Sequence, residues 1–159
     1  MNIEYVEMDE HGLELTVPLR QKIIKYHMER SPKYFYERYA GMDAGRGNEL
    51  LLEKAIKGGM RVDLARDTET GELVGYCIST ISVEKQGEVD SIYIEPDYRG
   101  TGIGDNLMKR ALHWMDEQPV TKKVLGVGAG NEEVFAFYSR YNFYPRTTIL
   151  EQVETEEGE

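Results

Sequence analysis

A glycine-rich turn between a predicted strand and a predicted helix is the part of this sequence best suited to chemistry. The β-rich run 87–94 leads through residues 99–104, Arg-Gly-Thr-Gly-Ile-Gly, into an amphipathic stretch. The first N–H groups of a helix lack intrahelical partners, the helix dipole favours negative charge there, and glycines let an anion approach the backbone. The turn therefore predicts an anion site suited to a phosphate-bearing cofactor. Because glycine-rich loops also occur simply to turn the chain, loop composition alone leaves both interpretations open.

Two familiar phosphate-binding motifs do not fit this turn. From Gly100 the pattern is G-x-G-x-G, so the third glycine comes one residue too early for the dinucleotide fingerprint, and no Lys-Ser or Lys-Thr pair follows it. A second glycine cluster at 126–130 lacks both the spacing and the basic residue of a nucleotide loop. We interpret that second cluster as a strand that ends in a loop.

The spacing of the turn resembles a signature of a known family. Arg99-x-x-Gly102-x-Gly104, directly after Tyr-Ile-Glu-Pro-Asp-Tyr, resembles the acetyl-coenzyme A signature Q/R-x-x-G-x-G/A of the GCN5-related N-acetyltransferase (GNAT) family. Asn131 and the following Phe-Ala-Phe-Tyr-Ser-Arg-Tyr-Asn-Phe resemble the family's second motif, in which Asn142 here replaces the usual glycine. Asparagine tolerates the left-handed conformation that a helix end often needs. The resemblance covers roughly residues 60–150, whereas residues 13–59 match no pattern that we can name.

The resemblance implies acetyl-coenzyme A as cosubstrate, without a metal ion. Its thioester would lie between two splayed parallel strands, one ending at Ile94 and the other near Val127, and its pyrophosphate would sit on the amides of 99–104. Backbone groups of Ile92 and Ile94 would bind the pantetheine and the thioester carbonyl, forming a small oxyanion hole. Asn131 would contact the pantetheine arm, cap the last helix, or do both. The implied cofactor-binding residues are Ile92, Tyr93, Ile94, Arg99, Gly100, Thr101, Gly102, Ile103, Gly104, Asn131, Phe135 and Tyr138.

Two carboxylates are candidates for the base that an amine acceptor needs. An alkyl ammonium with a pKa of about 10.4 is deprotonated in only about one molecule in 10³ at neutral pH. Glu88 and Asp90 stand two apart, so on a regular strand they project from the same face, with Ile92 after them. Glu88 falls where some family members carry a glutamate base, so we prefer it. Alternatively, both are solvated sheet residues, and a β-bulge would change which side chains point inward.

Tyr138 is the candidate donor to the leaving coenzyme A thiolate. It occupies the tyrosine of the Phe-Tyr pair that donates to the sulfur in many family members, and a tyrosine with a pKa of about 10 stays protonated at pH 7. The alternative is a buried helical stripe, because Val134, Phe137, Tyr138 and Tyr141 have i, i+3, i+4, i+7 spacing. The position in the motif favours the donor role.

The histidines and the one cysteine show no catalytic pattern. His11, His27 and His113 have no partner at metal or triad spacing, so we expect solvated or half-buried side chains. Cys77, the only cysteine, lies mid-strand and is expected in the core; it excludes an intrachain disulfide and a multi-cysteine zinc site.

Composition bounds the class of protein. The chain has 159 residues, of which 40% are hydrophobic, and its 19 basic against 29 acidic residues give a net charge of −10. This length suits one soluble domain with a real core. The acidity argues against nucleic acid and favours a cationic partner. Neither membrane insertion nor secretion is supported by the apolar runs or by the acidic first residues, so a cytoplasmic location is expected.

The elements that must position these residues alternate between helical and β-rich runs. We expect strands at 3–8, 62–66, 73–83, 87–94, 124–127 and 145–153, and helices at 17–29, 34–39, 48–57, 102–117 and 131–141. The resemblance implies an α/β (α+β) GNAT fold, a mixed, mostly antiparallel sheet of six to seven strands flanked by helices. We expect a single N-acetyltransferase domain at 1–150 and an acidic tail at 151–159.

The leading hypothesis is an acetyl-coenzyme A-dependent N-acetyltransferase that acts by direct transfer to a primary amine in a ternary complex. The alternative is a catalytically silent acyl-coenzyme A-binding or sensor module on the same fold. The acceptor remains open among a small-molecule amine, a polyamine, an aminoglycoside and a protein amine, and so does a homodimer. The aromatic cluster Tyr34, Phe35, Tyr36 and Tyr39 could hold an ammonium group or pack the second helix onto the sheet.

Overall fold

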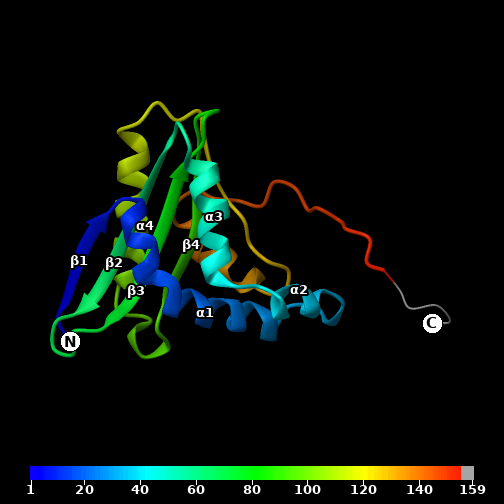
Figure 1. Ribbon diagram of the computed structural model, residues 1–159, viewed down its shortest axis with the longest axis horizontal. Helices are drawn as coiled ribbons and strands as arrows, with labels where there is room; N and C mark the ends of the chain where they lie inside the picture. Colours follow the sequence, from blue (N-terminus) through cyan, green and yellow to red (C-terminus); the bar gives the residue numbers. More distant parts are fainter. Residues whose placement is uncertain (155–159) are drawn as a thin grey trace.

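The computed structural model describes residues 1–154, in which a five-stranded sheet carries helices on both faces (Figure 1). The strands are β1 (Ile3–Met8), β2 (Gly59–Asp67), β3 (Leu73–Ile81), β4 (Gln86–Ile94) and β5 (Lys122–Leu125). The helices are α1 (Leu13–Arg30), α2 (Tyr36–Ala40), α3 (Ala44–Ala55), α4 (Ile103–Asp116) and α5 (Phe135–Ser139). The end of the acidic tail predicted at 151–159 lies outside the described residues.

The sheet is mixed and mostly antiparallel, as predicted. Its strand order is β1-β2-β3-β4-β5; the first four strands are antiparallel neighbours, and β5 pairs with β4 in parallel. The expected number of six to seven strands is wrong, because residues 145–153 do not form a strand. A strand needs a neighbour to satisfy its backbone groups and bury a face, but this segment runs away from the sheet (Figure 1), and Ile149 and Leu150 are 87% and 90% exposed.

Two hydrophobic clusters hold the helices against the sheet. The predicted apolar stripe of α4 packs on one face, in a cluster made of Ala65, Val74, Cys77, Val89, Ile103, Leu107, Met108, Ala111 and Met115. The other face packs against α1 and α3 through Leu13, Leu19, Met60, Val62, Leu64, Tyr76, Ile78 and Tyr93. Cys77 is a core residue, as expected, and burial raises the pKa of its thiol to about 12.

Helix α1 begins earlier than predicted. We expected it to start near residue 17, so that Pro18 would fall in the first turn, but it starts at Leu13 and includes Pro18. Proline removes one backbone donor, which leaves the carbonyl of Glu14 without its usual partner. Burial of Leu13 and Leu19 against the sheet extends the helix across this defect, and the Thr16 hydroxyl donates to the Leu13 carbonyl at 2.7 Å.

The last helical segment is shorter and less regular than predicted. We expected one helix at 131–141. The structure has a 3-10 turn (Glu132–Val134) followed by α5, which is only five residues long. The segment ends at Asn142, whose φ is +66°. The replacement of glycine by asparagine at this position is therefore accommodated in the left-handed conformation, as we expected.

Strand β4 carries the two irregularities that create the site. Ile78 faces Ser91 while Ser79 faces Val89, so Asp90 is the extra residue of a β-bulge. Pairing with β5 ends at Val89 and Leu125, although β4 continues to Ile94, so the two parallel strands splay as the resemblance implied. No helix among the described residues is long and apolar enough to cross a membrane.

Candidate active site

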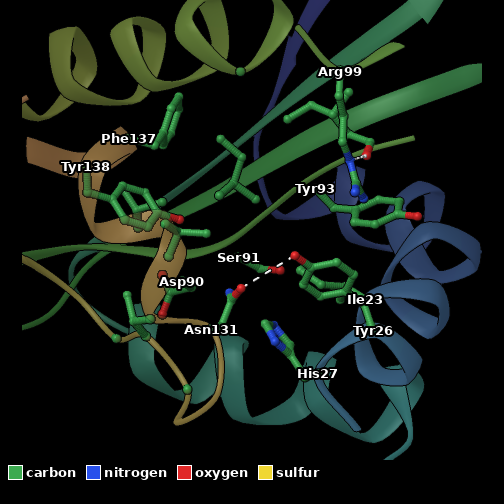
Figure 2. A pocket seen from close by; sticks show the side chains of 18 of the residues that line it. Ile23, Tyr26, His27, Asp90, Ser91, Tyr93, Arg99, Asn131, Phe137 and Tyr138 are labelled. Atoms are coloured by element: carbon green, nitrogen blue, oxygen red, sulfur yellow. Dashed lines mark hydrogen bonds between the residues drawn. The ribbon is translucent and has the colours of Figure 1, made fainter. Parts of the chain in front are cut away.

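A cleft of about 640 Å³ opens where β4 and β5 part (Figure 2). Its walls come from β4, the start of α4, the loop after β5, α5 and the second half of α1. Ten of the predicted site residues line it: Asp90, Ile92, Tyr93, Ile94, Arg99, Gly100, Gly102, Gly104, Asn131 and Tyr138. Four others, Glu88, Thr101, Ile103 and Phe135, are not among its lining residues.

The glycine turn forms one end of the cleft. Gly100 and Gly102 have φ angles of +76° and +92°, a region that favours glycine, and a Cβ at either position would meet no atom within 4 Å. Gly104 packs closely, since its Cβ would lie 3.4 Å from Ile94 Cδ1. The first intrahelical bond runs from the Asn106 N–H to the Gly102 carbonyl at 3.0 Å, so the preceding amides at the start of α4 are left for an anion.

Two of the predicted turn residues play structural roles. Ile103 is buried in the cluster under α4, and its backbone alone belongs to the turn. The Thr101 hydroxyl donates to the Tyr98 carbonyl at 2.5 Å, which fixes the turn from outside the cleft.

Arg99 is held in place by backbone and aromatic contacts. Its Nε donates to the Ile94 carbonyl at 2.8 Å. Its guanidinium carbon lies 5.4 Å from the ring centroids of both Tyr26 and Tyr93. Since Nε is used internally, the terminal nitrogens of the guanidinium are the ones available for a ligand.

The β-bulge separates the two predicted carboxylates from Ile92. Lys54 of α3 binds both acids, with Nζ 2.7 Å from Glu88 Oε1 and 2.5 Å from Asp90 Oδ1. Glu88 and Asp90 therefore share a face, as predicted. Ile92 packs instead in the cluster under α4, so the expectation that it follows them on that face is wrong, because the extra residue of the bulge reverses the alternation.

Of the two predicted carboxylates, Asp90 is the one that lines the cleft. Its side chain is 6% exposed, and its second oxygen, Oδ2, accepts from the Thr80 hydroxyl at 2.7 Å. Burial raises the pKa of Asp90, while the contacts with Lys54 and Thr80 act in the opposite direction. Glu88, which we preferred as base, points toward Lys54 outside the cleft.

Tyr138 enters the cleft from α5. Burial raises its pKa to about 12, so the hydroxyl is protonated over the physiological range. Phe137 packs edge to face against it with ring centroids 5.2 Å apart and lines the cleft as well. Phe135, which we expected to bind the cofactor, lies outside the cleft and is 37% exposed. It precedes Phe137 by two residues, which places it about 200° away around the helix axis, on the opposite side of α5.

Asn131 is buried at the loop after β5. It occupies the N-cap position of the 3-10 turn Glu132–Val134, as expected, but its side chain makes no capping bond. The Glu132 carboxylate accepts from the Gly130 N–H at 3.0 Å. The Tyr26 hydroxyl donates to Asn131 Oδ1 at 3.4 Å, the contact drawn in Figure 2. Asn131 is therefore tied to α1 across the cleft.

The wall from α1 and α2 is the part of the site that the sequence did not reveal. Ile23, Tyr26, His27 and Tyr39 all line the cleft. The spacing of the first three, i, i+3 and i+4, indicates one helix face, but it is equally typical of core packing. Of the predicted aromatic cluster, Tyr39 lies in the site, whereas Tyr34 and Tyr36 are exposed.

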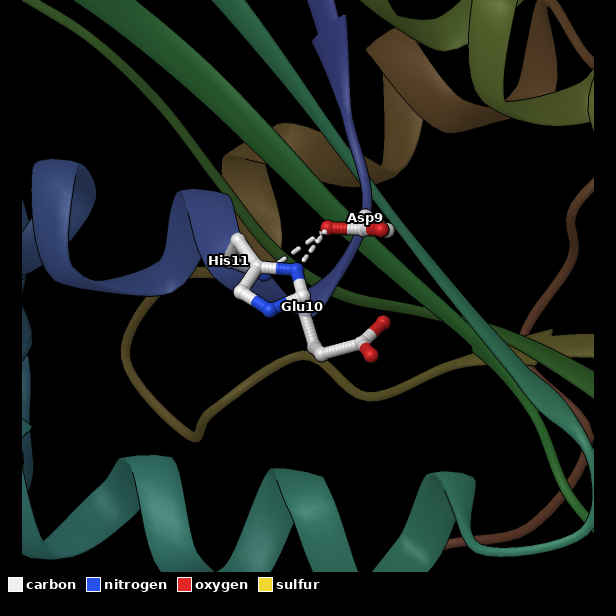
Figure 3. Close-up of side chains that lie close together, drawn as sticks. All are labelled: Asp9, Glu10 and His11. Atoms are coloured by element: carbon white, nitrogen blue, oxygen red, sulfur yellow. Dashed lines mark hydrogen bonds and ion pairs between the residues drawn. The ribbon is translucent and has the colours of Figure 1, made fainter.

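A separate group of acidic and histidine side chains lies at the start of α1 (Figure 3). The Asp9 carboxylate accepts from the His11 backbone N–H at 3.0 Å and contacts its ring Nδ1 at 2.7 Å. These bonds lower the pKa of Asp9 and raise that of His11. Asp9 caps the 3-10 turn Glu10–Gly12, and this local role accounts for the grouping of the three side chains.

Comparison with known proteins settles the family. A model of the acetyltransferase (GNAT) family matches residues 23–143. The chain belongs to this family. The match includes the α1 wall as well as both motifs of this GNAT protein. The N-terminal region, for which the sequence suggested no relatives, is thus partly a family feature.

Relatives of this GNAT protein include sequences and structures. It is 31% identical over 72 residues to an uncharacterised N-acetyltransferase of Methanocaldococcus jannaschii, a match that covers 45% of this chain and 32% of that protein. The chain thus spans about a third of the length of that relative. A putative acetyl transferase from Pyrococcus furiosus has a TM-score of 0.66 and 25% identity, with coverage of 94% of this chain and 99% of that one.

An aminoglycoside N-acetyltransferase solved in complex with CoA has the same fold. Its TM-score is 0.64 at 14% identity, and the match covers 96% of this chain and 95% of that one. The GNAT fold of the present chain is therefore shown, with five strands among the described residues.

Proposed function

We propose that this protein transfers the acetyl group of acetyl-coenzyme A to a primary amine by direct attack in a ternary complex. One observation carries the proposal: the splay of β4 and β5, the glycine turn at the start of α4 and the Tyr138 side chain all meet in a single cleft. The open space beside the two glycines of positive φ suits a pyrophosphate.

The cosubstrate would be held mainly by backbone groups. The amides of 99–104 and the guanidinium of Arg99 would bind the pyrophosphate, and the backbone of β4 at Ile92 and Ile94 would bind the pantetheine arm beside Asn131. Acetyl-coenzyme A supplies an activated acyl group as a thioester. Arg99 already donates to the Ile94 carbonyl, so this side chain joins the proposed phosphate end of the site to the proposed thioester end.

Tyr138 stabilises the leaving thiolate in this proposal. A thiol with a pKa of about 8.5 leaves as an anion that needs a hydrogen-bond donor at neutral pH. Burial keeps the Tyr138 hydroxyl protonated, and its surroundings in the apolar cluster strengthen a bond to a charged acceptor. The hydroxyl recovers any proton that it gives up from the acylated nitrogen through water.

Asp90 attracts the cationic acceptor in this proposal. It is the carboxylate of the predicted pair that lines the cleft, and it lies at the β-bulge of β4. Glu88 supports it through the shared Lys54. The protein's net charge of −10 adds a long-range attraction for cations.

A silent acyl-coenzyme A-binding module is the second candidate function. The observation that favours it is the full engagement of Asp90, because Lys54 binds one of its oxygens and Thr80 the other.

Release of free thiol distinguishes the two functions. Acetyl-coenzyme A is incubated with the protein and with spermidine, tyramine, kanamycin or an alanyl peptide, one representative of each open acceptor class. Acetyl transfer predicts thiol release that depends on one of the amines. Thermal stabilisation by acetyl-coenzyme A without turnover on any amine would support the silent module, and absence of both would overturn the assignment of the cleft.

A further inference from the structure

His27 lines the cleft, and the proposed function has given it no role so far. It projects from α1 into the cavity between Asn131 and Tyr26 (Figure 2). Its ring centroid lies 5.7 Å from that of Tyr26 and 6.1 Å from that of Tyr39. Within residues 1–154, neither ring nitrogen of His27 has a hydrogen-bond partner, so an imidazole lone pair is available on the cavity side.

The other histidines of the described chain are engaged elsewhere. His11 is bound to Asp9, and His113 is 76% exposed on α4, where its Nε2 lies 2.9 Å from Glu117 Oε1. His27 thus differs from both in position and in partners.

Burial and the charge of Arg30 favour the neutral imidazole of His27, whose charged neighbours are of both signs. Arg30 lies one turn further along α1, Asp90 lies on the facing strand, and Glu133 of the loop after β5 contacts both Tyr26 and Arg30. Burial, followed by the charge of Arg30, lowers the pKa of His27 below its usual 6.5. A neutral imidazole is the form that can accept a proton.

The two carboxylates of the cleft, Asp90 and Asp105, are engaged by other side chains in this structure. Both oxygens of Asp90 are occupied, by Lys54 and Thr80. Asp105 is bound by Lys109 at 2.8 Å and by the Tyr141 hydroxyl, and these contacts lower its pKa. A carboxylate stabilised by cations and donors gives up that stabilisation when it is protonated.

We propose that His27 is a catalytic residue that accepts the proton which the acceptor ammonium must lose before it can attack. The inference rests on the proposed acetyl transfer and deepens it by naming the base. It also defines the acceptor class: a primary ammonium that enters between the rings of Tyr26 and Tyr39, with Asp90 opposite, and gives its proton to the imidazole.

The protons and electrons of this step balance. One N–H bond of the ammonium breaks, its proton goes to the free imidazole nitrogen, and the electron pair stays on the amine nitrogen. That pair forms the C–N bond while the C–S bond breaks and its electrons go to sulfur. The second amine proton passes through water toward the sulfur, whose charge Tyr138 stabilises in the meantime. His27 finally releases its proton to solvent, so no other reactant is required.

The test compares His27→Gln with His113→Gln, a matched variant of an exposed histidine. We expect His27→Gln to lower kcat about 10²- to 10⁴-fold with the fastest amine of the four-member panel. In the wild type the rate should decrease at acidic pH with a midpoint below 6.5, and His27→Gln should lack this decrease. His113→Gln should leave both unchanged. Thermal stabilisation by acetyl-coenzyme A should be equal in the three proteins.

Two further measurements separate catalysis from structure. In the free wild-type protein, NMR titration of the three histidines should show one ring with a depressed pKa, and its signal should vanish in His27→Gln. In His27→Ala, added imidazole should restore part of the rate, which a purely structural role would not allow. A His27→Gln variant that keeps the wild-type rate and its decrease at acidic pH overturns this inference alone. A wild type that binds acetyl-coenzyme A but acetylates no amine overturns the proposed function with it.

Discussion

Substitution of Gly100 by alanine separates backbone strain from cofactor binding. Gly100 has a φ of +76° in the turn, and Gly71, in the β2–β3 turn, has a φ of +77°. A Cβ at either position would meet no protein atom within 4 Å. The two substitutions therefore impose nearly the same backbone penalty without a clash. They differ in position, because only Gly100 lines the cleft.

The expected effects can be worked out from this pair. An alanine forced into the left-handed region costs about 1–2 kcal/mol, so each variant should unfold about 2–8 °C below the wild type. Acetyl-coenzyme A at 100 times its Kd should stabilise the wild type and Gly71→Ala by about 2.7 kcal/mol. If the Cβ of Gly100→Ala raises Kd tenfold by holding the pyrophosphate off the amides, the same concentration should add only about 1.4 kcal/mol.

Thermal unfolding with and without the ligand measures both effects, and calorimetric titration gives Kd directly. Equal destabilisation of the two variants without ligand is the internal check on the strain argument. Equal stabilisation of the two variants by acetyl-coenzyme A would refute the placement of the pyrophosphate at the turn. A loss of ligand response in Gly71→Ala would show that the effect spreads through the fold.

Two further substitutions test the roles given to the cleft. Tyr138→Phe should lower kcat about 10²-fold at unchanged Kd for acetyl-coenzyme A, with the exposed Tyr144→Phe as control; an unchanged rate would remove the hydroxyl from the mechanism. Lys54→Met should cost about 1–3 kcal/mol at pH 7.5, because it leaves the buried Asp90 carboxylate without its cation. That loss should shrink toward pH 5: the folded-state pKa of Asp90 lies above its unfolded value, so protonation favours the folded state as the pH falls. Urea unfolding of both proteins at the two pH values measures this loss of stability. An equal loss at pH 7.5 and pH 5 would contradict the role of Lys54 as the cation that stabilises the Asp90 carboxylate.

The local patterns of the sequence predicted the elements around the glycine turn of the site. The apolar stripe of α4, the antiparallel run of β2 to β4 and the two glycines at positions 100 and 102 are all encoded within short windows of sequence. Helix periodicity, turn chemistry and the need for positive φ depend on neighbouring residues only, so they can be read without the fold.

Patterns that depend on distant partners could not be read in this way. The segment 145–153 has the composition of a strand, but a strand exists only where an edge pairs with it, and here it has none within the described residues. The bulge at Asp90 arises from the register between β3 and β4, and it moved Ile92 to the opposite face. Phe137, and not Phe135, lines the cleft, because the orientation of α5 against the sheet decides which of its side chains point inward.

The sequence by itself determined the family resemblance, the glycine turn that we propose to bind an anion, and the core of the sheet, because each depends on spacing along one segment. Only the tertiary structure decided what faces the acceptor. It placed Lys54 between Glu88 and Asp90, and it brought Tyr26 and His27, more than a hundred residues before Tyr138 in the chain, to the same cleft. These side chains, far apart in the sequence, meet because helix α1 packs over the splayed end of β4. The periodicity of a single segment does not contain that information.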